Sequence, residues 1–226
     1  MNIVKPYARL LPPSDLGVAG NEFTVNDGAV LLRRIEWCAR ISHRSEDAEP
    51  DTLRFLRSVV LQHGDWSVVE HASVSVDFYV DRGITHELVR HRLFAFTQES
   101  TRFVNYEKKM PPSFIEPDLG YSTASMGVFH RVINQLENAY RELIELGNAP
   151  QIARSVFPNA LASRIVITGN LRNWRHFLLM RTTKEAHPQM REVTIPLLAE
   201  FQAKIPILYE DIEPLAKQAD NLRKGR

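Results

Sequence analysis

Apolar and polar residues alternate most regularly between His71 and Asp81. Apolar side chains occupy every second position there, which is the period of a half-buried β-strand; these positions are Ala72, Val74, Val76, Phe78 and Val80. Residues 163–168 (SRIVIT) have the composition and length of a second strand. Residues 2–10 form a short third one, ended by the Pro12-Pro13 pair. These segments predict a small β-sheet.

Other segments repeat their apolar positions at the helical period. The longest covers residues 127–146, with apolar side chains at i, i+3, i+4 and i+7: Phe129, Val132, Ile133, Leu136, Tyr140, Leu143 and Ile144. Further helices are expected from Asn26, from Asp51 to Gly64, from Pro150 to Pro158, over Trp174–Arg181 and over residues 189–203. Their expected N-terminal caps are Asn26 or Asp27, Asp51, and Asn173.

No internal repeat or linker interrupts this pattern. It predicts a single α+β domain over residues 1–226, with a small, mostly antiparallel sheet covered by long helices. The polar tail from about Glu213 is expected to fray.

Composition and charge narrow the classes of function. The 226 residues are 44% hydrophobic and 24% charged, which is ordinary for a soluble globular protein. A net charge of +1 gives little support to general nucleic-acid binding. Cys38 is the only cysteine, which rules out an internal disulfide and a thiolate zinc site. The sequence shows neither a signal-peptide pattern nor a membrane-length apolar run, so we expect a cytoplasmic protein without a membrane partner.

One otherwise apolar stretch, residues 84–103, contains an unusual number of hydrogen-bond donors. Arg90, His91 and Arg92 are adjacent, and Ser100 and Arg102 follow after a short interval. We expect the stretch to begin as a helix and to lose its regularity after Arg92, because residues 97–101 are poor helix formers. So many donors among apolar residues indicate an anion-binding site.

A metal site is not expected in this stretch. His86, Glu87 and His91 resemble a zinc-protease signature with one residue too many. On a regular helix, a five-residue step turns the second histidine about 140° away from the first. A nucleotide is a better candidate, but the chain has no glycine-rich phosphate loop, so side chains must anchor it. Arginine suits that role because its planar fork binds phosphate bidentately. The candidates are Arg90, Arg92, Arg102, Arg154, Arg172 and Arg181, and the competing interpretation of each is a surface ion pair.

The Arg90-His91-Arg92 triplet, followed by seven residues and Ser100, resembles the signature of flavin-dependent thymidylate synthases. Further elements of that family resemble segments that follow the same order along this chain, over roughly Ala39 to Glu192. These are Ala39-Arg40-Ile41-Ser42, His63-Gly64 with Ser67 and Glu70-His71, Ala153-Arg154 with Pro158, and Asn170 and Arg172 with His176 and Arg181.

The resemblance implies an enzyme that makes dTMP from dUMP, with FAD as cofactor and 5,10-methylenetetrahydrofolate and NADPH as co-substrates. It also implies a homotetramer with active sites at the subunit interfaces and no cysteine nucleophile. By position in the motifs, Arg181 is the implied catalytic residue, facing the uracil edge from a neighbouring subunit. The residues implied to bind dUMP are Glu87, Arg90, Gln98, Ser100, Thr101, Arg102, Arg154 and Arg181. Those implied to bind FAD are Ser42, Ser67, Glu70, Arg90, His91, Arg92, Gln98, Asn170, Arg172 and His176.

The chain departs from the family pattern near this signature. Ala95 replaces a frequent serine, Thr97 a frequent asparagine, and Gln98 stands where glutamate can occur. Glu87 stands where some relatives have glutamine, and His187 has no assigned role. Two other hypotheses remain open. One is a nucleotide- or RNA-binding module without catalysis, and the other is a flavoprotein of the same fold without the synthase activity.

Overall fold

The computed structural model describes residues 1–12, 22–106, 111–118 and 122–213. The tail that the sequence predicts to fray therefore lies almost entirely outside the described residues. Two compact units are distinguished within the chain. Unit 1 comprises Met1–Tyr7, Phe78–Arg90 and Phe96–Val166, and unit 2 comprises Ala8–Asp77, His91–Ala95 and Ile167–Arg226. Among the helices of the described residues, none has the length and apolar character needed to cross a membrane.

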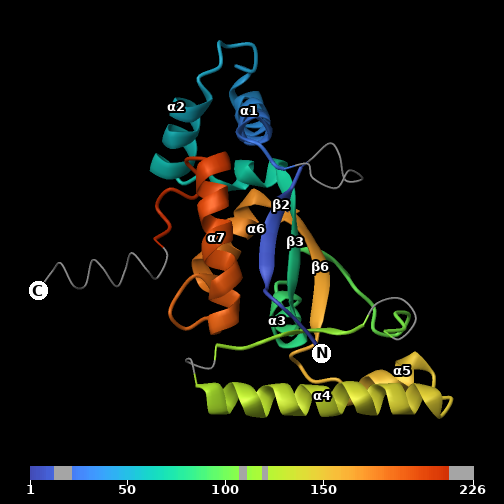
Figure 1. Ribbon diagram of the computed structural model, residues 1–226. Helices are drawn as coiled ribbons and strands as arrows, with labels where there is room; N and C mark the ends of the chain where they lie inside the picture. The colour runs from blue at the N-terminus through green and yellow to red at the C-terminus, as the bar shows by residue number, and fades with distance from the viewer. Residues whose placement is uncertain (13–21, 107–110, 119–121, 214–226) are drawn as a thin grey trace, which may run out of the picture. The chain divides into compact units, whose positions relative to one another are not determined.

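The main sheet has four strands in the order β2-β3-β6-β4, three of which are labelled in Figure 1. They are β2 (Tyr7–Leu11), β3 (Ser73–Asp81), β6 (Ala162–Asn170) and β4 (Ala95–Gln98). At one end of the β3–β6 pair, the Leu171 amide donates to the Ala72 carbonyl, and at the other end the Arg82 amide donates to the Leu161 carbonyl. The two strands are therefore antiparallel, and the expected α+β class is confirmed.

A second, two-stranded sheet was not expected. In unit 1, β1 (Asn2–Val4) pairs in parallel with β5 (Ser113–Ile115). The prediction of one strand over residues 2–10 was wrong, because the segment forms two strands, β1 and β2, separated at Pro6, which has no amide proton for a ladder. Strand β5 was likewise not expected from the sequence, and it buries Phe114 and Ile115.

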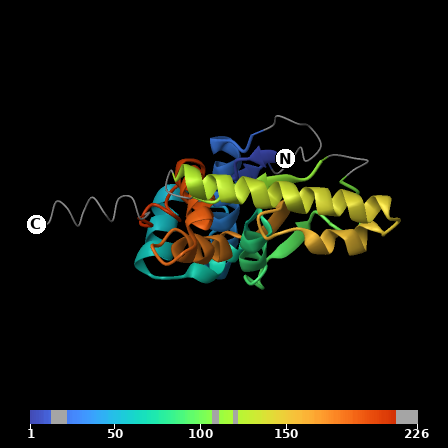
Figure 2. The same cartoon turned by 60° about the horizontal axis from the view of Figure 1, so that its bottom comes forward.

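The helices of unit 1 are α3 (Arg82–Leu88), α4 (Thr123–Glu145) and α5 (Pro150–Ala153), which continues as the short turn η4 (Arg154–Val156). Figure 2 shows α4 as one long helix with α5 beside its C-terminal end. The α4 residues Ile133 and Tyr140 pack into a cluster with Phe114 and Leu161, and the ring of Tyr140 stacks on Phe157 at 4.5 Å. The apolar stripe predicted on α4 is therefore its core-facing side.

The N-terminal helices of unit 2 are α1 (Val25–Arg40), the turn η1 (Ile41–His43), α2 (Thr52–Leu56), the π-helical η2 (Arg57–Gln62) and η3 (Trp66–His71). The C-terminal ones are α6 (Leu171–Arg181) and α7 (Pro188–Lys204). Trp174 and Phe177 of α6 and Phe201 of α7 are almost fully buried. The indole nitrogen of Trp174 donates to the carbonyl of Val74 at 3.1 Å, which attaches α6 to β3.

Two of the predicted caps were wrong. Thr24, not Asn26 or Asp27, caps α1, and Asp27 instead closes a capping box with Thr24. Asn170, not Asn173, caps α6 by accepting a hydrogen bond from the Asn173 amide at 2.8 Å. In each case the capping residue lies three positions before the amide that it satisfies, so each helix begins earlier than its apolar pattern indicates. Asp51 caps α2 as expected.

The close crossing of α1 and α7 gives a test of the packing in unit 2. A Cβ atom on Gly28 would lie 1.7 Å from the carbonyl oxygen of Lys204, so Gly28→Ala must move one helix. We expect this variant to lose about 1–3 kcal/mol of unfolding free energy, measured by urea denaturation. Gly127→Ala in α4 is the matched control, because its Cβ would meet nothing within 4 Å. The unfolding free energy of this control should increase by about 0.5–1 kcal/mol. Equal effects of the two substitutions would contradict the packing described.

Candidate functional site

The donor-rich stretch changes conformation three times. Helix α3 is capped by Asp81, whose carboxylate accepts from the Ile84 amide at 2.7 Å, and it ends at Leu88. Turns follow, and the chain then extends as β4 over residues 95–98. The expectation of a helix as far as Arg92 was wrong, so Arg90, His91 and Arg92 lie after the helix rather than on one of its faces.

A contact in unit 2 explains why the helix does not continue. A Cβ on Gly169 would lie 2.3 Å from Cδ1 of Phe94, so the ring of Phe94 lies directly against the backbone of β6. The rings of Phe94 and Trp174 also pack edge to face, with centroids 4.7 Å apart. This packing holds residues 91–95 against β6 and α6 and is incompatible with continued helical backbone.

His91 and Arg181 meet within unit 2. The guanidinium Nε of Arg181 donates to the Nε2 atom of His91 at 2.9 Å, and the imidazole packs edge to face on Phe177. Burial, followed by the charges of Arg181 and His176, lowers the pKa of His91 from 6.5 to about 4. Because arginine can only donate, His91 must be neutral and carry its proton on Nδ1. The pair therefore presents a fixed N–H donor beside a permanent positive charge.

A second arginine of unit 2 is less constrained. Arg172, at the start of α6, donates to the carboxylate of Glu70 at 2.6 Å, and both side chains are about half exposed. An ion pair this exposed contributes little to stability, so the guanidinium is available to an anionic ligand. Of the other residues expected to bind FAD in this unit, Asn170 caps α6, and His176 and Arg92 are exposed.

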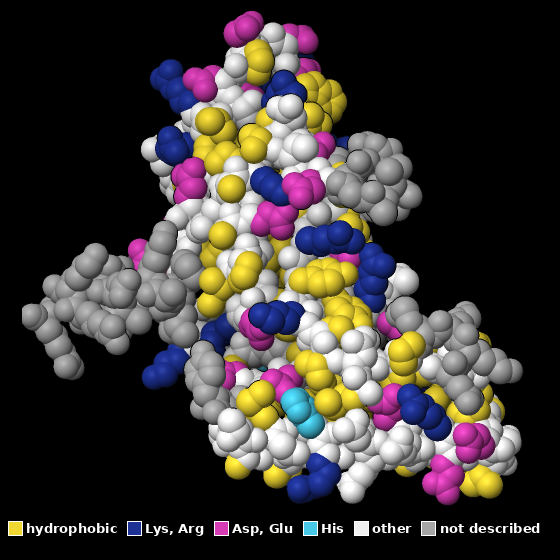
Figure 3. Space-filling view, viewed as in Figure 1, with side chains coloured by type: hydrophobic (Ala, Val, Ile, Leu, Met, Phe, Trp, Pro, Cys, Tyr) yellow, Lys and Arg dark blue, Asp and Glu magenta, His cyan; other side chains and the backbone are white. Residues whose placement is uncertain are grey.

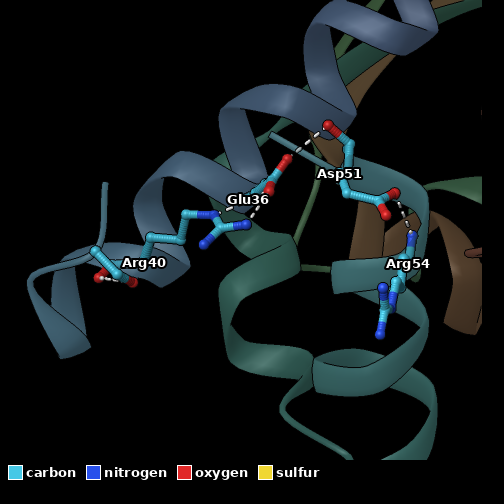
Figure 4. A network of polar contacts seen from close by, with 6 residues as sticks. Glu36, Arg40, Asp51 and Arg54 are labelled. Atoms are coloured by element: carbon cyan, nitrogen blue, oxygen red, sulfur yellow. Dashed lines mark hydrogen bonds and ion pairs between the residues drawn. The ribbon is translucent and has the colours of Figure 1, made fainter. Parts of the chain in front are cut away.

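The Ala39–Ser42 element is held by a polar network at the end of α1 (Figure 4). Arg40 donates through Nε and Nη2 to one carboxylate oxygen of the buried Glu36, and Thr52 donates to the other oxygen at 2.6 Å. The Arg40 guanidinium also lies over the ring of Phe55, 4.5 Å from its centroid. The guanidinium of Arg40 thus makes contacts that stabilise the fold. Ser42 of this element and Ser67 of η3 are exposed.

Unit 1 brings together several of the residues expected to bind the nucleotide. Arg154 of η4 donates through Nη1 to the hydroxyl of the buried Thr101 at 2.6 Å. The Ser100 hydroxyl accepts from the backbone amide of Arg102 at 3.3 Å, and the Arg102 side chain is exposed. A hydroxyl group and two arginines from neighbouring turns form a donor set suited to a phosphate.

Gln98 has the most specific surroundings in unit 1. Its amide Nε2 donates to the hydroxyls of Thr85 at 3.0 Å and Ser163 at 3.1 Å, both of which are almost fully buried. Thr85 and Ser163 belong to none of the sequence motifs described above. The available signal was a hydroxyl at a core-facing position of a helix and of a strand, where an apolar residue is usual. Glu87 and Arg90 lie on α3 and just after it.

Comparisons with known proteins match the part of the chain that contains these elements. The family model described as "Thymidylate synthase complementing protein" matches residues 31–207. A protein of Mycolicibacterium gilvum named flavin-dependent thymidylate synthase is 34% identical, over 83% of this chain and 81% of that protein. Proteins of the same name from Mycobacterium sp. (strain KMS) and Corynebacterium glutamicum are 35% and 33% identical. These two alignments cover 88% and 89% of this chain and 90% and 85% of the relatives.

The lowered pKa of His91 predicts an acid sensitivity. Between about pH 6.5 and about pH 4 the unfolded chain takes up a proton at this residue that the folded protein does not. The free energy of unfolding should therefore fall as the pH decreases through this window, and this contribution should be constant above it. In urea denaturation from pH 4 to 8, His91→Gln should show a smaller decrease than the unsubstituted chain.

The matched control is His86→Gln, which replaces an exposed histidine of α3. The decrease in unfolding free energy should be smaller in His91→Gln than in this control. Identical pH profiles for His91→Gln and the unsubstituted chain would show that His91 titrates normally.

Proposed function

Because the chain belongs to the family of flavin-dependent thymidylate synthases, we propose that it converts dUMP to dTMP with FAD as cofactor. The proposed co-substrates are 5,10-methylenetetrahydrofolate, which supplies the carbon, and NADPH, which supplies the electrons. The observation that carries the proposal is the ordered set of family elements, from Ala39-Arg40 to Arg181, within the matched region. The family resemblance expected from the sequence is confirmed.

The chemistry requires a reductant as well as a carbon donor. The carbon that leaves the folate is at the oxidation level of a methylene group and must gain two electrons to become a methyl group. The hydride chemistry of this reduction would be supplied by FAD held in the site, with NADPH as the proposed source of electrons. The protein residues then have three tasks, which are to hold the nucleotide phosphate, to stabilise charge on the pyrimidine and to orient the flavin.

The phosphate task falls to unit 1. Arg154, Arg102 and Ser100 supply two permanent charges and a hydroxyl to a dianion, and Thr101 orients Arg154. Glu87, Arg90 and Gln98 complete the set proposed to bind dUMP. Because Thr101 is buried and Arg154 is half-buried, the guanidinium is oriented before the ligand arrives, which reduces the entropy lost on binding.

We assign to Arg181 the stabilisation of negative charge on the pyrimidine. A guanidinium at the uracil edge favours the N3-deprotonated, electron-rich ring, which is an electrostatic role in the transition state. We propose that Arg181 reaches this ring from a neighbouring subunit of a homotetramer with active sites at its interfaces. Within one chain Arg181 donates to His91 through Nε, which is one of the five N–H groups of its guanidinium.

The chain's donors suit the flavin task. FAD carries an anionic pyrophosphate, and Arg90, Arg92 and Arg172 are exposed guanidiniums. Neutral His91 offers one fixed N–H donor, a group that hydrogen-bonds ring nitrogens and carbonyls. The remaining residues proposed to contact FAD are Ser42, Ser67, Glu70, Gln98, Asn170 and His176.

A nucleic-acid-binding module is the weaker alternative. On the face of the described residues shown in Figure 3, Lys and Arg side chains are interspersed with Asp and Glu. Together with the net charge of +1, this distribution differs from the continuous basic surface that such a module uses. We therefore propose a cytoplasmic enzyme that uses small-molecule partners and no nucleic acid. Oligonucleotide binding that weakens steeply with salt, in a protein that takes up no flavin, would favour the alternative.

The function is tested with purified protein. It should show the absorbance of bound flavin, and it should form dTMP from dUMP when methylenetetrahydrofolate and NADPH are supplied. Arg181→Ala should lower dTMP formation by about 10²–10³-fold, the usual effect of removing a group that stabilises transition-state charge.

Arg131→Ala is the matched control, because Arg131 is an exposed arginine of α4 outside the proposed site. It should form dTMP at the unsubstituted rate. Turnover by Arg181→Ala near that rate would refute the catalytic assignment, and a protein that cannot be loaded with FAD would refute the function.

A further inference from the structure

The polarity of the Gln98 side chain is fixed by its neighbours in unit 1. The Thr85 hydroxyl donates its single proton to the carbonyl oxygen of Arg82, at 2.9 Å, one helical turn earlier. Thr85 Oγ1 can then only accept from Gln98. The group of Gln98 that faces Thr85 must therefore be the amide NH2, because the carbonyl oxygen would place two acceptors about 3 Å apart.

Ser163 strengthens this arrangement from β6. Its hydroxyl accepts the other proton of Gln98 Nε2 at 3.1 Å, so both N–H groups of the amide are satisfied by buried hydroxyls. Among the described residues, no donor reaches the carbonyl oxygen Oε1 of Gln98. The Nε2 group of Gln98 therefore donates to one residue of α3 and one residue of β6, while its Oε1 atom accepts no hydrogen bond from the described residues.

The position of Gln98 connects it to the nucleotide. It is the last residue of β4, and the Ser100–Arg102 turn that we assign to the phosphate follows at once. A neutral acceptor here suits a neutral donor of the nucleotide. In dUMP, the neutral donors are the 3′-hydroxyl of the deoxyribose and, in the ground state before the ring loses its proton, the N3–H of the uracil ring.

We propose that Thr85 and Ser163 are positioning residues that hold Gln98 with its carbonyl oxygen toward dUMP, where it accepts one of these two hydrogen bonds. The proposal rests on the function proposed above. A carboxylate at position 98 could not donate a proton to Thr85. The Thr85 hydroxyl would then have to donate to that carboxylate and would lose its hydrogen bond to the Arg82 carbonyl.

The test measures binding of dUMP and two analogues to the FAD-loaded protein by calorimetry. The analogues are 2′,3′-dideoxyuridine monophosphate, which lacks the hydroxyl, and N3-methyl-dUMP, which lacks the ring N–H. The unsubstituted chain should bind one analogue about tenfold more weakly than dUMP, and that analogue identifies the donor. Equal affinity for all three nucleotides would overturn the proposal.

The positioning role is tested by substitution at Thr85. Thr85→Val removes the hydroxyl at constant shape, so the amide can turn over, and discrimination between dUMP and the informative analogue should be lost. Thr85→Ser keeps the hydroxyl and should retain discrimination. Because Thr85 acts through Gln98, adding Thr85→Val to Gln98→Leu should change dUMP affinity less than adding it to the unsubstituted chain.

Thr168→Val is the control, since it removes a partly buried hydrogen bond between two hydroxyls of the sheet, to Ser75 at 2.7 Å, that involves no residue of the proposed site. It should bind all three nucleotides as the unsubstituted chain does. If Thr85→Val discriminates normally, or if its effect adds fully to that of Gln98→Leu, the positioning role is refuted.

A ligand-free measurement separates this proposal from the function. The Gln98 side-chain amide protons should exchange slowly in the NMR spectrum of the unsubstituted chain and faster in Thr85→Val. Normal dUMP binding with unchanged exchange in Thr85→Val would overturn the positioning alone. If FAD-loaded protein binds no dUMP, the proposed function fails and the nucleotide contact fails with it, while the exchange rates still decide what orients the amide.

Discussion

The contact between Phe94 and Gly169 is the constraint on which the candidate site depends. Because residue 169 has no side chain, an aromatic ring lies directly on the backbone of β6, where a single methyl group would be 2.3 Å from it. The ring is held there by Trp174 of the following helix. This contact ends the helical course of the chain after α3 and lets β4 form beside β6. The arginines and histidine of the family signature thereby leave the helix and become available to ligands.

In both units, the direction of a hydrogen bond is fixed because one of its two partners can only donate or only accept. In unit 2, Arg181 can only donate, so His91 must accept and must be neutral. In unit 1, the Thr85 proton is committed to a backbone carbonyl, so Gln98 must donate through its amide nitrogen. In both cases a neighbour with a single possible role leaves the ligand-facing group with a defined polarity. Such preorganisation reduces the cost of ordering the site when a ligand binds.

Much of the architecture followed from periodicity alone. The alternation over residues 71–81 and the stripe on α4 are strong patterns, and both elements formed within a few residues of their expected bounds. The elements that were missed depend on partners distant in sequence. Strand β5 has three residues, too few to show a period, and exists because β1 pairs with it. The end of α3 could not be predicted because it depends on Gly169, which lies 75 residues after Phe94 in the printed sequence. The candidate site residues came from ordered motifs, whereas Thr85 and Ser163 belong to no motif and emerged only from their hydrogen bonds.

The most direct test of this account compares FAD binding by the unsubstituted chain and by Gly169→Ala, measured as quenching of flavin fluorescence on titration with protein. The added methyl group must displace Phe94 and, with it, the segment that carries His91 and Arg92. We predict that the unsubstituted chain binds FAD and that Gly169→Ala, with circular dichroism still typical of an α+β fold, binds it at least about tenfold more weakly, a loss of about 1.4 kcal/mol. Equal affinities would contradict the claim that this contact places the signature residues, and an unsubstituted chain that does not bind FAD would contradict the account as a whole.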